Sequence, residues 1–206
     1  MSLKKQALSG VKWTFIQQFG VQGIGFIVSI VLARLLEPEE FGLIAMITIF
    51  IGIGNALLNA GLGSSLIRSK ELNEEDYSTV FYFNLVVSVI VYLITYFAAP
   101  YIAQFYKQYI LIGLIRWLTL TFIINAFAII QTTRLTKIMD FKTQTIVAIP
   151  SLIIGGIVGV IMAYQNYGVW SLIGFNLVKS LANTIQLWIH TKWKPLWVFN
   201  KEKFKH

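Results

Sequence analysis

The 206-residue sequence contains no cysteine and only two histidines, His190 and His206. Without cysteine the chain can form no disulfide, no thiolate nucleophile and no cysteine-based metal site. Neither histidine belongs to a serine–acid or carboxylate constellation, and no zinc, phosphate-loop or dinucleotide motif occurs. We therefore expect no enzyme activity, no cofactor and no metal. His190 is expected to lie at a membrane interface.

Charged residues are also scarce. They make up 13% of the chain, whereas hydrophobic residues make up 56% and the mean hydropathy is +0.69. Soluble domains usually carry about 25% charged residues. Six mostly apolar stretches are each long enough to cross ~30 Å of hydrocarbon as a helix: 13–33, 41–67, 78–99, 110–130, 146–164 and 169–189. The sequence therefore predicts an all-α, polytopic membrane protein whose residues 1–190 form a six-transmembrane-helix bundle.

The basic residues are distributed unevenly between the two sides of this bundle. Only Arg34 and Lys107 fall in the loops of one side. The termini and the loops of the other side hold thirteen: Lys4, Lys5, Lys12, Arg68, Lys70, Arg134, Lys137, Lys142, Lys192, Lys194, Lys201, Lys203 and Lys205. Cytoplasmic segments carry such an excess, so both termini are predicted to be cytoplasmic. The basic tail, residues 191–206, is expected to anchor the last helix at anionic lipid or to link it to another lobe.

Several segments between the spans carry residues that begin helices. Pro38 is followed by two acids, and Asn73 is followed by three. Proline and acids suit a first helical turn, because proline's missing N–H is not needed there and the helix dipole favours negative charge. Asp140, a lone acid in a basic loop, is expected to cap the helix that follows it.

Prolines and glycines inside the apolar stretches predict how the helices end and pack. Pro100 and Pro150 lie near the ends of predicted spans, and we expect them to mark helix boundaries. Gly155 and Gly159 are four residues apart. Such a pair of small residues predicts close approach of a neighbouring membrane helix.

One cation, Lys179, stands near the middle of the last predicted span. It lies roughly 15 Å from the start of that span, too deep to snorkel to either surface. A cation at this depth costs at least ~2.5–3.5 kcal/mol and usually faces a bundle interior or a wet cavity. Four further polar residues recur with it at three- and four-residue spacing and share one helix face: Asn176, Asn183, Gln186 and His190.

The six predicted spans contain no Asp or Glu that could neutralise Lys179. A cavity with uncompensated positive charge favours an anionic ligand. Phosphate or pyrophosphate groups are the predicted anions, because cationic side chains bind them strongly. We therefore predict that Lys179 and the neighbouring amides Asn176, Asn183 and Gln186 contact a substrate.

Three other spans carry polar residues. Arg116 lies roughly 9 Å from the outer end of the fourth span. The first span has a polar stripe that includes Gln18 and Gln22, and the second has one that includes Asn55 and Asn59. All five are predicted to contact substrate. The alternative is that the amides join helices, at under ~2 kcal/mol per contact, and that Arg116 snorkels outward.

Four short stretches stand out along the chain. They are Leu32-Ala33-Arg34-Leu35-Leu36-Glu37-Pro38-Glu39-Glu40-Phe41-Gly42, Met139-Asp140-Phe141-Lys142, Asn166-Tyr167-Gly168-Val169-Trp170-Ser171-Leu172 and Lys194-Pro195-Leu196 with Phe199. In this order and spacing, over nearly the whole chain, they resemble the polysaccharide-biosynthesis flippases, the Wzx-type transporters of lipid-linked oligosaccharides. That family shares a superfamily with the multidrug and toxic-compound extruders.

The resemblance implies a lobe of six helices, with a second, similar lobe completing a central cavity. It also implies a cargo of polyprenyl-diphosphate-linked oligosaccharide, moved by alternating access across the bacterial inner membrane. Arg116 and Lys179 match regions where such flippases place cavity cations. Glu37 departs from the family, in which glycine is usual at this position.

The family continues for about as long again beyond the sixth span. We therefore expect this chain to be an N-terminal lobe, from a longer or split protein, or else one of two copies that associate. Two other functions stay open: a drug or organic-cation exporter of the extruder type, and a non-transporting scaffold in a glycan-assembly complex. The exporter would want an intramembrane carboxylate to bind a proton or sodium ion, and the six spans have none.

Overall fold

The computed structural model describes residues 3–58 and 73–197. The regular elements in these ranges are all α-helices: α1 (Leu3–Leu35), α2 (Pro38–Leu58), α4 (Glu74–Phe105), α5 (Leu111–Leu118), α6 (Leu120–Lys137), α7 (Phe141–Tyr164) and α8 (Trp170–Thr191). The predicted all-α class is therefore confirmed.

Five segments of the described chain are long and apolar enough to cross a membrane, which confirms the polytopic prediction: Gly10–Leu35, Pro38–Leu58, Glu74–Phe105, Leu111–Lys137 and Phe141–Tyr164. The fourth of these combines α5 and α6. With 22 residues, α8 is also long enough, but its polar face makes it less apolar than the others, so a sixth span stays a prediction. The second predicted span extended to residue 67, and its last part, residues 59–67, lies outside the described residues.

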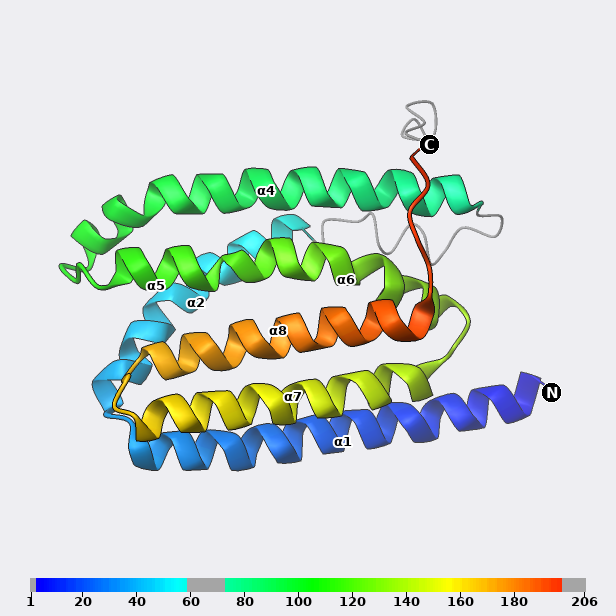
Figure 1. Cartoon of the computed structure of the whole chain (residues 1–206), viewed down its shortest axis with the longest axis horizontal. Coiled ribbons are helices and arrows are strands. Elements are labelled where there is room, and N and C mark those ends of the chain that lie inside the picture. Colours follow the sequence, from blue (N-terminus) through cyan, green and yellow to red (C-terminus); the bar gives the residue numbers. More distant parts are fainter. Residues whose placement is uncertain (1–2, 59–72, 198–206) are drawn as a thin grey trace.

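Most of the helices lie side by side in one layer. The order across the layer is α4, the α5–α6 pair, α8, α7 and α1, and α2 crosses one side of it (Figure 1). We call this the α2 side. The end of the layer that holds the start of α1 and the end of α8 is called the terminal end, and the opposite end is called the distal end. Towards the distal end, Ile47 of α2 packs with Leu111, Leu114 and Ile115 of α5, and these four residues are fully buried.

The predicted helix starts are confirmed. The backbone N–H of Glu37 donates to the carboxylate of Glu40 at 2.9 Å, and the N–H of Asn73 donates to that of Asp76 at 2.8 Å. In both cases an acid in the first turn binds the backbone of the residue before the helix, which is half of a capping box. The carboxylate of Asp140 caps α7 by accepting a 3.0 Å bond from the backbone N–H three residues later.

The prediction that Pro100 and Pro150 mark helix ends is wrong. Pro100 lies inside α4 and Pro150 lies inside α7. A proline within a helix leaves the carbonyl four residues earlier without its usual donor. Membrane helices tolerate this when a neighbouring helix supplies a replacement donor, so the rule that proline ends a helix fails where the packing provides one.

The predicted close approach at Gly155 and Gly159 is confirmed, and the partner is α8. A Cβ added at Gly155 would lie 2.7 Å from the Cβ of Lys179 and 2.8 Å from the carbonyl oxygen of Phe175. One added at Gly159 would lie 2.9 Å from the Cβ of Phe175. The two helices therefore touch backbone to backbone, and Lys179 begins its side chain directly over Gly155.

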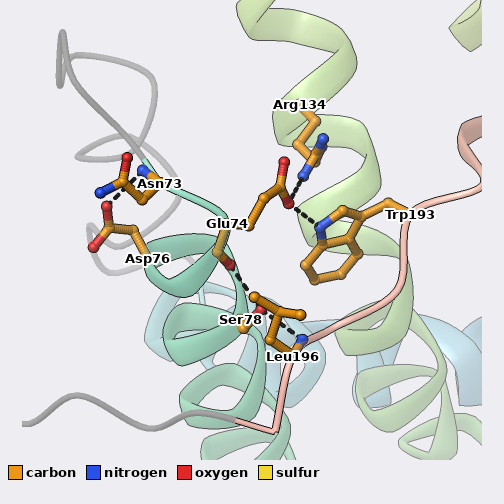
Figure 2. A network of polar contacts seen from close by, with 7 residues as sticks. All are labelled: Asn73, Glu74, Asp76, Ser78, Arg134, Trp193 and Leu196. Atoms are coloured by element: carbon orange, nitrogen blue, oxygen red, sulfur yellow. Dashed lines mark hydrogen bonds and ion pairs between the residues drawn. The ribbon is translucent and has the colours of Figure 1, made fainter.

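At the terminal end, the segment after α8 packs across α4 and α6 (Figure 2). The carboxylate of Glu74, at the start of α4, forms a salt bridge with Arg134 at 2.5 Å and accepts a 2.6 Å hydrogen bond from Trp193 Nε1. Further along, the backbone N–H of Leu196 donates to the hydroxyl of Ser78 at 2.9 Å. The described part of the predicted tail is thus attached to the bundle, and Glu74 joins three segments.

Candidate functional site

The two opposite faces of α8 differ in chemistry. One face presents apolar side chains: Leu181, Ile185 and Ile189 are 44%, 56% and 63% exposed. The opposite face carries Asn176 and Asn183, which are half-buried. Asn183 lines the same cavity as Asn55 of α2, so the polar face of α8 points to the α2 side of the layer. The apolar face is suited to lipid.

A cavity of about 280 Å³ lies between α2, α4, α6 and α8. Its lining includes one asparagine from each of these four helices: Asn55, Asn84, Asn125 and Asn183. The rest of the lining is uncharged as well: Leu58, Phe122, Ala126, Ala128, Ile129 and Thr132. We call this cavity the amide pocket.

Asn84 is the most buried amide of the pocket. Its side chain is 3% exposed, and its Nδ2 atom has no hydrogen-bond partner among the described residues. A buried polar group left without a partner costs about 1–3 kcal/mol. The pocket therefore holds a donor for which a polar ligand, or water, would supply the acceptor.

Of these four asparagines, Asn55 and Asn183 are predicted from the sequence to contact substrate, whereas Asn84 and Asn125 are not. Both missed residues carry a signal in the sequence, because each is the only amide within its predicted apolar span, 78–99 or 110–130. Polar residues within membrane helices usually face the protein interior. The same argument that singled out Lys179 would have found them.

Lys179 lies one helical turn before Asn183 and is half-buried. Its Nζ sits 5.8 Å from the centre of the Phe175 ring, within the range of a cation–π contact. It forms no salt bridge with any carboxylate in residues 3–58 and 73–197. The described part of the chain thus leaves the charge of this ammonium group without a counterion.

Three of the predicted substrate contacts have partners within the chain. Gln186 Nε2 donates to the hydroxyl of Ser151 on α7 at 2.9 Å. Asn176 Nδ2 donates to the carbonyl of Leu172, one turn earlier, at 2.8 Å. The guanidinium carbon of Arg116 lies 4.0 Å from the centre of the Tyr96 ring. Each contact gives the side chain a structural role.

The polar stripe of α1 lies apart from the amide pocket. Gln18 and Gln22 are exposed. The helix packs against α7 through Gly20 and Val28, and neither glutamine is among the residues that line the amide pocket. Gln18 also borders a second, mostly apolar cavity of about 560 Å³ beside the start of α7. Asn59 lies outside the described residues.

Two of the four stretches that suggested a family pack against each other at the distal end. Gly168, between α7 and α8, has a φ of +56°, and a Cβ there would collide with the carboxylate of Glu40. Around this contact, Leu36 and Leu172 belong to one buried cluster. The α1–α2 turn and the α7–α8 turn therefore form one unit, although more than a hundred residues separate them.

The chain is similar to proteins of bacterial polysaccharide synthesis. It is 25% identical to the succinoglycan biosynthesis transport protein ExoT of Rhizobium meliloti (strain 1021) over 97% of this chain and 40% of that protein. It is 27% identical to the teichuronic acid biosynthesis protein TuaB of Bacillus subtilis (strain 168), over 99% of this chain and 43% of that protein. It is also 27% identical to the lipopolysaccharide biosynthesis protein WzxC of Escherichia coli (strain K12), over 60% of this chain and 25% of that protein.

The chain therefore spans less than half the length of these relatives. No solved structure matches it. The sequence profile of the family described as "Polysaccharide biosynthesis protein" matches residues 31–206. This range includes all four of the stretches in which the resemblance was seen, and it covers most of the chain. The chain belongs to the polysaccharide biosynthesis protein family.

Proposed function

We propose that the chain forms the first lobe of a flippase that moves polyprenyl-diphosphate-linked oligosaccharide across the bacterial inner membrane. The observation that carries this proposal is Lys179. It is a half-buried cation at mid-helix, on the helix whose polar face points to the α2 side, and it has no counterion in the described part of the chain. The relatives, which include a succinoglycan biosynthesis transport protein, support the same class of function.

The uncompensated charge of Lys179 favours an anionic group, and the diphosphate of the cargo supplies one. Asn55 and Asn183 add neutral hydrogen-bonding groups on the α2 side of the layer. Gln18 and Gln22 of α1 are exposed and offer further amides. A layer of helices with one polar side and one apolar side suits a lobe of this kind. Its polar side would face a second lobe across a water-filled cavity. That second lobe would be another part of a longer protein or a second copy of this chain.

The distribution of charge supports an orientation. The described basic residues gather at the terminal end, among them Arg134, Lys142 and Lys194, whereas the distal end has Arg34 and Lys107. Because basic residues favour the cytoplasmic side, we place the terminal end in the cytoplasm. No observation favours the organic-cation exporter or the scaffold over the flippase.

The test is the variant Lys179→Ala in cells that depend on this gene for surface glycan. We expect lipid-linked oligosaccharide to accumulate on the cytoplasmic leaflet and surface glycan to be lost, because the diphosphate loses its cation. Lys179→Arg keeps the charge and is expected to retain export. Lys194→Ala, at an exposed lysine outside the bundle, is the matched control. Normal export by Lys179→Ala at equal protein level would refute the role of Lys179, and normal export after deletion of the gene would refute the function.

A further inference from the structure

We propose that the amide pocket is a binding site for one uncharged sugar ring, separate from the group that Lys179 attracts. The identification of that ring as part of the cargo rests on the proposed function. The choice of a neutral, hydroxyl-rich ligand rests on the pocket alone.

The lining excludes ionic ligands. None of its ten residues carries a charge, and Lys179, one turn away on α8, is not among them. An anion moved from water into such a site would lose its hydration without gaining a cation, and a cation would gain no carboxylate. A neutral ligand that forms several hydrogen bonds avoids both penalties.

The polar groups of the pocket match hydroxyls. Each of the four amides offers both donors and an acceptor. The hydroxyl of Thr132 donates to the backbone carbonyl of Ala128 at 3.2 Å and can still accept a hydrogen bond. A sugar hydroxyl donates and accepts in the same way. The unpartnered Nδ2 of Asn84 requires an acceptor, which a hydroxyl or ring oxygen provides. This buried donor is the strongest indication that the pocket is built for a ligand.

The size and the apolar part of the lining fit a single ring. A cavity of about 280 Å³ is much larger than the ~30 Å³ that one water molecule occupies in the liquid. It is smaller than most sites for drug-sized ligands, which begin at about 300 Å³. Phe122 contributes an aromatic side chain, against which the C–H groups of a pyranose can pack. A longer oligosaccharide would have to extend out of the pocket.

The pocket also joins α2 to the layer. Its lining comes from α2, α4, α6 and α8. The ring of Phe122 on α6 lies so close to Gly54 of α2 that a Cβ added there would displace the ring. The spacing of four positions from Lys179 to Asn183 corresponds to about 6 Å along the axis of α8. A sugar in the pocket would therefore lie near a diphosphate held by Lys179, as the proposed cargo requires.

The experiment is saturation-transfer difference NMR on the complete chain in a detergent that contains no sugar. The probes are the methyl glycosides of glucose, galactose, mannose and N-acetylglucosamine, with methyl glucuronide as an anionic probe. We expect saturation transfer to at least one neutral glycoside. Asn84→Leu, which replaces the amide by an apolar side chain of similar size, should weaken binding by about tenfold or more, since it removes a hydrogen bond from a buried site.

Two variants make the result specific. Gln104→Leu removes an exposed amide from the same helix, α4, and is expected to bind as the unaltered chain does. Asn183→Leu alters the pocket from α8 at a less buried position and is expected to repeat the loss even if Asn84→Leu does not fold. No signal from any neutral probe, retained binding in both pocket variants, or equal binding of the glucuronide would each overturn the proposal.

This proposal and the proposed function fail separately. If sugars bind in the pocket but deletion of the gene leaves glycan export intact, the flippase function fails and the pocket stands. If export depends on the gene but no neutral glycoside binds, the pocket assignment fails and the flippase function stands.

Discussion

Arg116 Nε donates a 3.4 Å hydrogen bond to the backbone carbonyl of Tyr96. This is the carbonyl that Pro100, four residues later in α4, leaves without its helical donor. The guanidinium also packs on the Tyr96 ring, with 4.0 Å between its central carbon and the ring centre. A cation predicted to contact substrate thus repairs a break in the neighbouring helix.

This relationship predicts a coupling between Arg116 and Pro100. Arg116→Met should lower the stability of the bundle by about 1–2 kcal/mol, because it removes a hydrogen bond within the membrane and a cation–π contact. In a Pro100→Ala background, where the restored N–H can satisfy the Tyr96 carbonyl, the same substitution should cost less. Thermal unfolding of the four proteins in detergent gives the double-mutant cycle. Costs that simply add would show that the two residues act independently.

Glu74 is predicted to hold the segment after α8 against α4 and α6, since its carboxylate binds both Arg134 and Trp193 (Figure 2). Glu74→Gln should cost about 1 kcal/mol, because the pair is partly exposed and screened by solvent. That cost raises opening of the segment about fivefold and should speed tryptic cleavage after Lys192 by a similar factor. The rate is measured by limited proteolysis.

The control for Glu74→Gln is Glu75→Gln, at an exposed acid one residue further along α4. It removes the same charge from the same helix start but should leave cleavage unchanged. Equal acceleration by both variants would mean that the helix dipole, which favours acids in a first turn, explains the effect without the Arg134 and Trp193 contacts.

Local chemistry explains why much of the fold was predictable from the sequence. The membrane-length helices follow from apolar runs, and the cap at Asp140 follows from one residue and its next turn. The close contact at Gly155 also followed from spacing alone, although the spacing did not identify α8 as its partner. Features that depend on a single helix can therefore be predicted from the sequence.

The site was less predictable because it depends on which helices meet. Asn55 and Asn183 share a pocket only because α2 and α8 both border it, together with α4 and α6. Gln186, on the same face of α8 as Asn183, instead bonds Ser151 on α7. A helical wheel shows that residues share a face but does not show what lies opposite. The error at Pro100 has the same origin, since the helix continues because α5 provides Arg116.

Gly168 is predicted to tolerate no larger residue, for two separable reasons. Its φ of +56° disfavours any side chain, and a Cβ would collide with the Glu40 carboxylate. Gly168→Ala should lose about 1 kcal/mol from the backbone conformation and a smaller amount from the collision, because the Glu40 carboxylate is the end of a flexible side chain. Because Glu40→Ala by itself removes the bond to the Glu37 N–H, the double variant is compared with Glu40→Ala alone, and in that background Gly168→Ala should cost only the first part, measured by thermal unfolding. If Gly168→Ala has no cost in that background, the backbone conformation contributes nothing to the loss of stability.

The contact between Gly155 and Lys179 links packing to the proposed function. Gly155→Ala places a methyl group 2.7 Å from the Cβ of Lys179 and 2.8 Å from a backbone carbonyl of α8, neither of which is a flexible side-chain end. The helices must therefore separate, at a cost of about 1–3 kcal/mol, and Lys179 moves with α8. We expect both a lower unfolding temperature and reduced glycan export.

Gly52→Ala is the matched control for Gly155→Ala, because a Cβ at Gly52 meets nothing within 4 Å and alanine favours the helix. It should leave export unchanged and leave stability equal or slightly higher. If Gly155→Ala lowers stability but export per folded molecule stays normal, the position of Lys179 does not limit transport. That result would count against a diphosphate site on α8, since a displaced ammonium group could not hold its ligand in the same place.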